Sequence, residues 1–207
     1  LKVDCIYRRL DDNFLDPKTF FKGSLIGVPG LFKSWRKGNV GILNAIGTGI
    51  ADDKVVYSYV NKMIVYYLGE QPILNQVETY LCNDEKQKKY VIENISKLVV
   101  KPANASGGYG IMIGPKAPKE ERDEVIRKIK KNPREYIAQP LETLSTAPTI
   151  TKNDIEPRHL DLRPFVLSGK STYVTTGGLT RVALRKGSTI VNSSQGGGSK
   201  DTLVVDV

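Results

Sequence analysis

The stretch from Leu98 to Gly114 combines residue types that suit an anionic ligand. Its apolar start, residues 98–100, is typical of a buried strand and ends at Lys101. A turn rich in glycine follows, made of Ser106, Gly107, Gly108, Tyr109 and Gly110. Glycines let backbone N–H groups surround an anion, so a lysine beside such a turn suits phosphate. The stretch lacks the Gly-Lys-Ser/Thr and GxGxxG patterns, and a plain β-hairpin is the alternative interpretation.

A second polar stretch, residues 192–202, lies between two apolar runs near the end of the sequence. Asn192 offers an amide oxygen to a metal or phosphate, and Lys200 offers a cation to a phosphate. Gly196, Gly197 and Gly198 permit close backbone approach. A flexible linker has a similar composition, but the tight apolar flanks favour a loop inside a sheet domain.

Three arginines near this stretch could recognise a carboxylate or phosphate through paired N–H groups. Arg181 and Arg185 are four residues apart, which predicts one face of a strand, and we expect Arg163 in the same region. Arginines gathered in a cleft are costly unless an anion meets them. The alternative is pairing with acids such as Asp161 or Glu156, and it is favoured more for Arg185 than for the others.

Composition narrows the class of protein. The chain has 207 residues, 40% of them hydrophobic and 26% charged, which fits a folded globular protein. Its apolar runs fall short of the roughly 18 residues of a membrane span, and no signal peptide is visible. Cys5 and Cys82 lack a CxxC pattern and predict reduced thiols in the cytoplasm. His159 is the only histidine, which argues against a histidine zinc site or a Ser-His-Asp triad.

The formal net charge of +9 favours anionic partners such as nucleotides, nucleic acid or an anionic surface. Much of the excess lies in runs that read as solvated helix faces, and no aromatic RNA-binding motif is present. Nucleic acid is therefore the weaker alternative. The pattern predicts helices over 51–68, 84–97 and 120–131 and hairpin strands from Leu160 onward. Their turns are expected at 168–170, 177–178 and 186–187, which gives an α+β fold with antiparallel sheets.

Several stretches, taken together and in order, resemble the circularly permuted ATP-grasp proteins. This group is related to glutathionylspermidine synthase and eukaryotic glutathione synthetase. The matching stretches run over nearly the whole chain and read VDCIYRRLDDNFLDP, GNVGILNAIGTGIADDKVVYSYV, LVVKPANASGGYGIMIG, REYIAQPLETLST, RHLDLRPFVL, GGLTRVAL and VNSSQGGGSKDT.

The resemblance implies an ATP-grasp fold in which two α+β subdomains with antiparallel sheets enclose a nucleotide cleft. It divides the chain into a linker strand and pre-ATP-grasp portion (1–97), a lid subdomain with the glycine-rich loop (98–142) and an antiparallel-sheet subdomain (143–207). It also implies ATP and magnesium as cofactors. In the implied reaction ATP phosphorylates a small-molecule or peptide carboxylate, and an amine then attacks the acylphosphate to give an amide.

The resemblance assigns roles by motif. Lys54 and Lys101 resemble the two lysines that contact ATP phosphates, and residues 106–110 resemble the lid over them. The stretch Gln139 to Glu142, with Leu141, resembles the hinge beside adenine. Arg181, with Arg163, is expected near the transferred phosphoryl group or the substrate carboxylate. Residues 192–200 resemble the loop on the substrate side (Asn192, Gly196, Gly197, Gly198 and Lys200), and Arg8 is expected to be another anion contact.

One feature of the family pattern has no counterpart here. The family carries a Glu-x-Asn magnesium pair before VDxIYRR, the point at which this chain begins, inside an expected strand. Asp11, Asp12, Asp161 and Asn192 are candidate ligands, but none matches that pair. We therefore expect either part of a longer ligase or a catalytically inactive remnant that binds a nucleotide or a partner.

Overall fold

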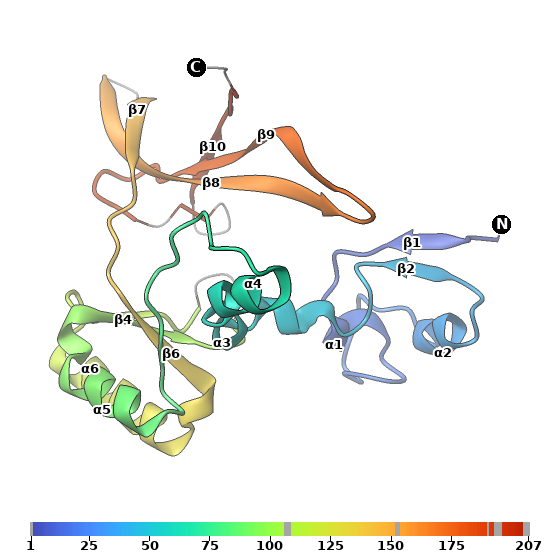
Figure 1. Cartoon of the computed structure of the whole chain (residues 1–207), viewed down its shortest axis with the longest axis horizontal. Coiled ribbons are helices and arrows are strands. Elements are labelled where there is room, and N and C mark those ends of the chain that lie inside the picture. Colours follow the sequence, from blue (N-terminus) through green and yellow to red (C-terminus); the bar gives the residue numbers. More distant parts are fainter. Residues whose placement is uncertain (1, 106–108, 152–153, 190, 193–195, 205–207) are drawn as a thin grey trace.

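Two antiparallel sheets dominate the computed structural model, which describes residues 2–105, 109–151, 154–189, 191–192 and 196–204 (Figure 1). The first, here called the lysine sheet, has the order β3-β6-β4-β5. The second, the arginine sheet, has the order β10-β9-β8-β7. The strands are β3 (Tyr80–Leu81), β4 (Leu98–Pro102), β5 (Met112–Ile113), β6 (Tyr136–Pro140), β7 (Thr146–Ile150), β8 (Ile155–Ser168), β9 (Thr172–Val182) and β10 (Gly198–Lys200).

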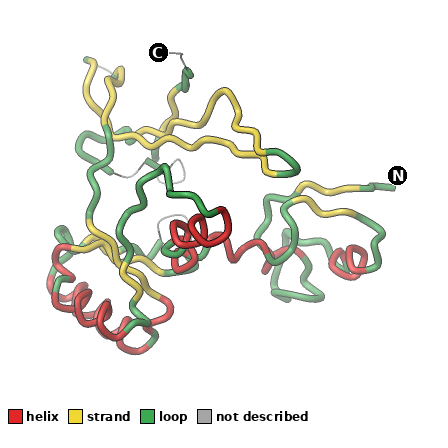
Figure 2. The backbone as a smooth tube through the Cα atoms, in the orientation of Figure 1, coloured by secondary structure: helices red, strands yellow, loops and turns green. Residues whose placement is uncertain are grey.

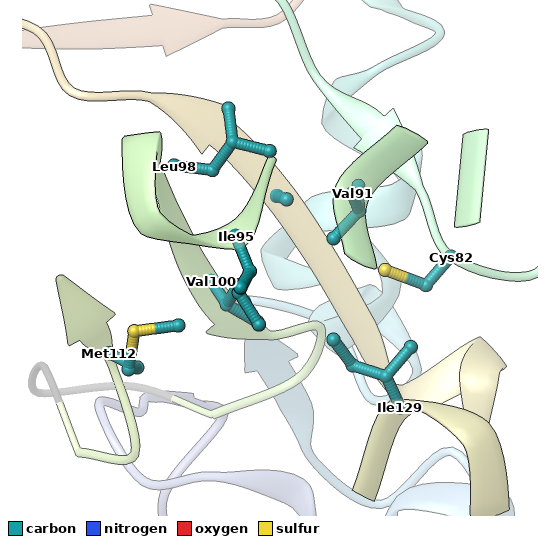
Figure 3. Packing of buried hydrophobic residues seen from close by; sticks show 8 residues of the cluster. Cys82, Val91, Ile95, Leu98, Val100, Met112 and Ile129 are labelled. Atoms are coloured by element: carbon teal, nitrogen blue, oxygen red, sulfur yellow. The ribbon is translucent and has the colours of Figure 1, made fainter. Parts of the chain in front are cut away.

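Helices cover one face of the lysine sheet and form the main core with it (Figure 3). These are α5 (Glu85–Glu93), which Asp84 caps by accepting from the Gln87 N–H at 2.9 Å, and α6 (Lys119–Lys131). Short 3-10 turns, η2 (Ile95–Lys97) and η3 (Pro133–Glu135), lead into β4 and β6. The buried cluster is Cys82, Val91, Ile95, Leu98, Val100, Met112, Ile129 and Ala138. Burial raises the pKa of the Cys82 thiol to about 12, and both cysteines are unpaired.

Strand alternation separates the core from the opposite face of the lysine sheet. Leu98 and Val100 of β4 enter the core, and the intervening Val99 and Lys101 line a cavity on the other side. In β6, Ala138 enters the core and Gln139 lines the cavity. One face of the lysine sheet is therefore buried in the core, and the polar side chains of Lys101 and Gln139 lie on the other face.

A smaller lobe holds the N-terminal segment, to the right in Figures 1 and 2. Its parallel strands β1 (Cys5–Tyr7) and β2 (Gly41–Leu43) pair beside helices α1 (Asp12–Leu15) and α2 (Leu31–Arg36). A small core of Leu15, Leu31 and Ile42 holds it together. Three short helices connect it to the lysine sheet: η1 (Thr48–Asp52), α3 (Lys54–Tyr57) and α4 (Val60–Leu68).

The carboxylate of Asp16 organises the loops of this lobe. It is fully buried and accepts from the backbone N–H groups of Lys18 (2.9 Å), Gly30 (3.0 Å) and Phe32 (3.0 Å) and from the Thr19 hydroxyl (3.3 Å). Burial alone would raise the pKa of Asp16, but these donors outweigh it and lower that pKa. A lowered carboxyl pKa stabilises the fold at neutral pH, and this stabilisation is lost as the pH falls through the folded-state pKa.

We expect Asp16→Ala to lower the free energy of unfolding of this lobe by about 3 kcal/mol, because it leaves several buried donors without an acceptor. Urea titration measures this free energy of unfolding. The fluorescence of Trp35 reports on the lobe, because Trp35 is the only tryptophan of the sequence and packs against the lobe's core. The control is Asp11→Ala, which removes only the exposed cap of α1, at a cost of about 1 kcal/mol. Equal losses in the two variants would contradict this role of Asp16.

Several sequence expectations need correction. The helix expected over 51–68 is broken, because Asp53 caps a new helix at Lys54 and Tyr59 precedes a further one. Residues 177–178 are not a turn but lie inside β9. A Cβ on Gly178 would lie 2.9 Å from the Arg163 carbonyl oxygen, so glycine there lets the two strands approach closely. Strands β7 and β10 were not expected. Strands were expected over 189–191 and 203–206; residues 190, 205 and 206 lie outside the described residues, and residues 189, 191, 203 and 204 belong to no strand.

The other expectations for the second half hold where they can be checked. The turns at 168–170 and 186–187 are present, the first of them joining β8 to β9. Arg185 follows the end of β9, so it does not share a strand face with Arg181. Within the described residues, no helix is long and apolar enough to cross a membrane.

Candidate functional site

Two adjoining cavities separate the lysine sheet from the arginine sheet. The first, of about 550 Å³, is lined from one side by Val99, Lys101 and Gln139 and from the other by Arg163 and Arg181. The second, of about 820 Å³, extends toward the N-terminal lobe and α3. The residues shared by both linings are Ile111, Arg163, Arg181 and Asn192. The cavities therefore form one cleft with two chambers.

Each chamber carries a lysine whose ammonium group meets neutral oxygens. In the first, the Lys101 Nζ donates to the Gln139 Oε1 at 2.6 Å. In the second, the Lys54 Nζ donates to the carbonyl oxygen of Ala105 at 2.6 Å and weakly to that of Ala103 at 3.5 Å. Neither ammonium group has a carboxylate partner among the described residues. Their charge is left for an anion to neutralise.

The electrostatics of the two lysines agree with this geometry. Burial lowers the pKa of Lys101, and the nearby charge of Lys54 lowers it further. Burial also lowers the pKa of Lys54, although Asp53 and Asp52 act in the opposite direction. A bound anion between them would stabilise both charged forms and raise both pKa values again.

Gln139 fixes the position of Lys101. Its side chain is buried, with 7% of its surface exposed, and its Nε2 donates to the Thr79 hydroxyl at 2.8 Å. The Thr79 hydroxyl in turn donates to the Val77 carbonyl oxygen at 3.0 Å. This orients the amide so that its oxygen faces Lys101. The sequence indicated Gln139 only as part of the stretch that resembles the hinge beside adenine. No local pattern indicates Thr79.

The two arginines of β8 and β9 differ in their partners. Arg181 lies opposite Asp161 in the register of the strands and binds it with two N–H groups, one at 2.9 Å from Nε to Oδ1. That hydrogen bond is the main reason why the pKa of Asp161 is lowered and that of Arg181 raised. Within the described residues, the Arg163 side chain has no hydrogen bond or ion pair, although its charge helps to lower the pKa of Asp161 and it lines both chambers. Pairing with Asp161, the alternative interpretation, therefore holds for Arg181.

Four of the other predicted site residues line the same cleft. Leu141 and Glu142 line the first chamber, Tyr109 the second, and Asn192 both. Gly110 has φ +71°, and a Cβ there would lie 2.9 Å from Pro102, which fits a tight turn. Ser106, Gly107 and Gly108 lie outside the described residues.

Other predicted contacts lie away from both linings. Arg8 is buried in the N-terminal lobe, where it donates to the carbonyl oxygens of Asn44, Leu10 and Ala45 and pairs with Asp12. These contacts engage the N–H donors of Arg8 and join the end of β1 to the loop after β2. The Lys200 Nζ donates to the Pro148 carbonyl oxygen on β7. Gly196, Gly197 and Gly198 also line neither chamber.

The described residues do not fit a protein-held metal ion. They contain no group of three His, Cys, Asp or Glu side chains that could hold one. Asp161 is engaged by Arg181, and Asp12 by Arg8 and the Gly47 N–H. The His159 Nδ1 lies 2.8 Å from the Leu144 carbonyl oxygen, and its imidazole has no acidic partner among the residues that the structure describes. No metal ligand is therefore assigned.

Two antiparallel sheets enclose this cleft, with Lys101 on one side and Arg163 and Arg181 on the other. The sequence of residues 1–183 matches the family model described as circularly permuted ATP-grasp type 2. The chain therefore belongs to this family, and the expected α+β ATP-grasp fold is confirmed.

Curated relatives cover the whole length of the chain. An uncharacterized protein of Synechocystis is 56% identical over 205 residues, which is 99% of this chain and 43% of the relative. An uncharacterized protein of Mycobacterium tuberculosis is 52% identical, over 99% of this chain and 37% of the relative. A Frankia casuarinae protein named "Putative glutamate--cysteine ligase 2-2" is 48% identical, over 98% of this chain and 23% of the relative. The chain thus spans about two fifths or less of these relatives.

Proposed function

We propose that this chain forms the nucleotide-binding and phosphoryl-transfer part of an ATP-dependent carboxylate–amine ligase. The observation that carries the proposal is the pair of partly buried lysines that, among the described residues, donate only to neutral oxygens and line the cleft together with Arg163. Membership of the ATP-grasp family supports ATP as the anion. The narrower likeness to glutathionylspermidine synthase stays a prediction.

The proposed reaction has two steps. A substrate carboxylate oxygen attacks the γ-phosphorus of ATP, the bond from that phosphorus to the β-γ bridging oxygen breaks, and ADP leaves. An amine then attacks the acyl carbon and phosphate leaves with the electron pair of the broken C–O bond, giving an amide. Neither step needs a nucleophilic side chain, because phosphoryl transfer depends on positioning and charge neutralisation.

Each cleft residue has a place in this scheme. Lys101 and Lys54 bind the phosphates, and Gln139 orients the Lys101 side chain. Arg163, at the junction of the chambers, binds the substrate carboxylate or the transferred phosphoryl group, with Arg181 beside it. Tyr109, next to the glycine-rich loop, helps to exclude water that would hydrolyse the acylphosphate.

Magnesium is proposed as the cation that accompanies ATP, since it commonly binds nucleotide phosphates. The described residues contain no group of three His, Cys, Asp or Glu side chains that could hold a metal ion, so no residue is assigned to it. The proposed substrates are small-molecule or peptide carboxylates and amines, in line with the ligase name printed for the Frankia relative. The unpaired thiols and the use of ATP fit a cytoplasmic protein.

The test is ADP formation from ATP and magnesium with sets of amino acids or short peptides, by this chain and by a full-length relative. ADP formation that requires both an acid and an amine supports the ligase. Nucleotide binding by both proteins without any turnover would contradict it and favour the inactive, nucleotide-binding remnant.

A related prediction concerns Gln139. We expect Gln139→Glu to weaken binding of ATP with magnesium about tenfold, because the new carboxylate pairs with Lys101 and repels the phosphates. Gln139→Met, which adds no charge, is the matched control and should cause a smaller loss. Equilibrium titration of both variants with ATP and magnesium measures the two affinities. Equal losses of affinity would show that the charge at this position does not affect ATP binding.

A further inference from the structure

Helix α3, which begins with Lys54, has no buried side chain. Polar contacts connect it to the residues next to β4 and β6 of the lysine sheet. The Lys54 N–H donates to the Ala103 carbonyl oxygen at 2.8 Å, and the Ala103 N–H donates to the Glu135 carbonyl oxygen at 2.8 Å. Arg134, the neighbour of Glu135, donates to the Asp53 Oδ2 at 2.6 Å.

These contacts close a ring, here called the clasp. It runs from Asp53 and Lys54 to Ala103, from there to Glu135 and Arg134, and back to Asp53. Asp53 also caps α3 by accepting from the Val55 N–H at 2.8 Å. Its side chain is 16% exposed, whereas that of Arg134 is 55% exposed. The carboxylate therefore sets the start of the helix from a mostly buried position.

The charge state of Asp53 is consistent with this role. Burial alone would raise its pKa, but the Arg134 hydrogen bond and the Val55 N–H outweigh burial and lower it. Arg134 is 81 residues away in sequence, so the pair is a tertiary contact.

We propose that Asp53 and Arg134 are positioning residues that hold Lys54 at the phosphate side of the cleft. This inference rests on the proposed function, in which Lys54 contacts ATP. Asp53 lines the second chamber beside Lys54, and both residues are proposed to act through the backbone and side chain of Lys54. The Lys54 Nζ also donates to the Ala105 carbonyl oxygen, so the clasp connects α3 to the segment that follows β4.

The test compares Arg134→Gln, Arg134→Lys and Asp53→Asn with Arg127→Gln, an exposed arginine of α6 outside the clasp. Asp53→Asn keeps an oxygen that can cap α3. The first readout is amide hydrogen exchange at Lys54 and Ala103, which needs no ligand. The second is the affinity for ATP with magnesium, measured also in the Lys54→Ala background.

We expect Arg134→Gln to speed exchange at both amides and to weaken ATP binding, each about tenfold, as for loss of a charge-assisted hydrogen bond. Arg134→Lys should restore part of both effects, and Arg127→Gln should change neither. In the Lys54→Ala background Arg134→Gln should cause no further loss of affinity.

Unchanged amide exchange, or the same loss of affinity with and without Lys54, would overturn the clasp. If the unmodified chain binds no ATP, the proposed function fails, and exchange alone decides on the clasp. Faster exchange would then still support it as the contact that places Lys54.

Discussion

Replacing Lys101 by alanine is expected to weaken the binding of ATP with magnesium about 100-fold, because a partly buried charge-assisted contact to phosphate is lost. Among the residues that the structure describes, the Lys101 Nζ donates only to the Gln139 amide oxygen. Competition against a fluorescent ATP analogue measures the change. Lys97→Ala, an exposed lysine at the end of η2, is the matched control. If Lys101→Ala binds ATP with unchanged affinity, Lys101 does not contact the phosphates.

The same lysines predict the pH dependence of binding. The pKa values of Lys54 and Lys101 are lowered in the free protein, above all by burial, and phosphate binding requires their protonated forms. Affinity should therefore fall as the pH rises through these lowered pKa values. The unfolded chain holds the two protons more tightly, so the free protein gains stability over the same pH range. ATP binding and stability thus change in opposite directions as the pH rises.

Replacing Arg163 by alanine is expected to reduce substrate-dependent ADP formation about 1,000-fold while changing ATP affinity little, as for an arginine that stabilises the transferred phosphoryl group. Within the described residues Arg163 is unpaired, whereas Arg181 is held by Asp161. Arg185→Ala, after the end of β9, is the control. The rate of a single turnover separates this step from product release.

Two results would contradict this role of Arg163. Unchanged turnover would exclude it from the reaction, and an equal loss of ATP affinity and turnover would make it a nucleotide contact only. The Arg181→Ala variant serves as a second comparison. Its loss would also leave Asp161 without its partner, so a fall in stability is expected there and not for Arg163→Ala.

The apolar run over residues 98–100 was sufficient to predict part of this site. Leu98 and Val100 are apolar and Lys101 ends the run, so the strand and its lysine followed from local pattern. The turn predicted at residues 177–178 was wrong, because glycines also occur where two strands must approach closely, here at the Arg163 carbonyl group. The break before Lys54 arises from the cap by Asp53, which competes with a longer helix.

The remaining features depend on contacts distant in sequence. Arg134 meets Asp53 across 81 residues, and Gln139 meets Thr79 across 60, without a local pattern that would indicate either. Arg8 and Lys200 are cations that suit an anion by type alone. The fold instead gives their donors to backbone carbonyl groups, those of Asn44 and Pro148 among them.

The most direct test of the account is calorimetric titration of ATP with magnesium into the 207-residue chain, with folding checked by circular dichroism. The account predicts saturable binding at one site, in the micromolar range typical of nucleotide-dependent enzymes. A folded chain that takes up no ATP would contradict the central claim that the cleft between the lysine sheet and the arginine sheet is a nucleotide site.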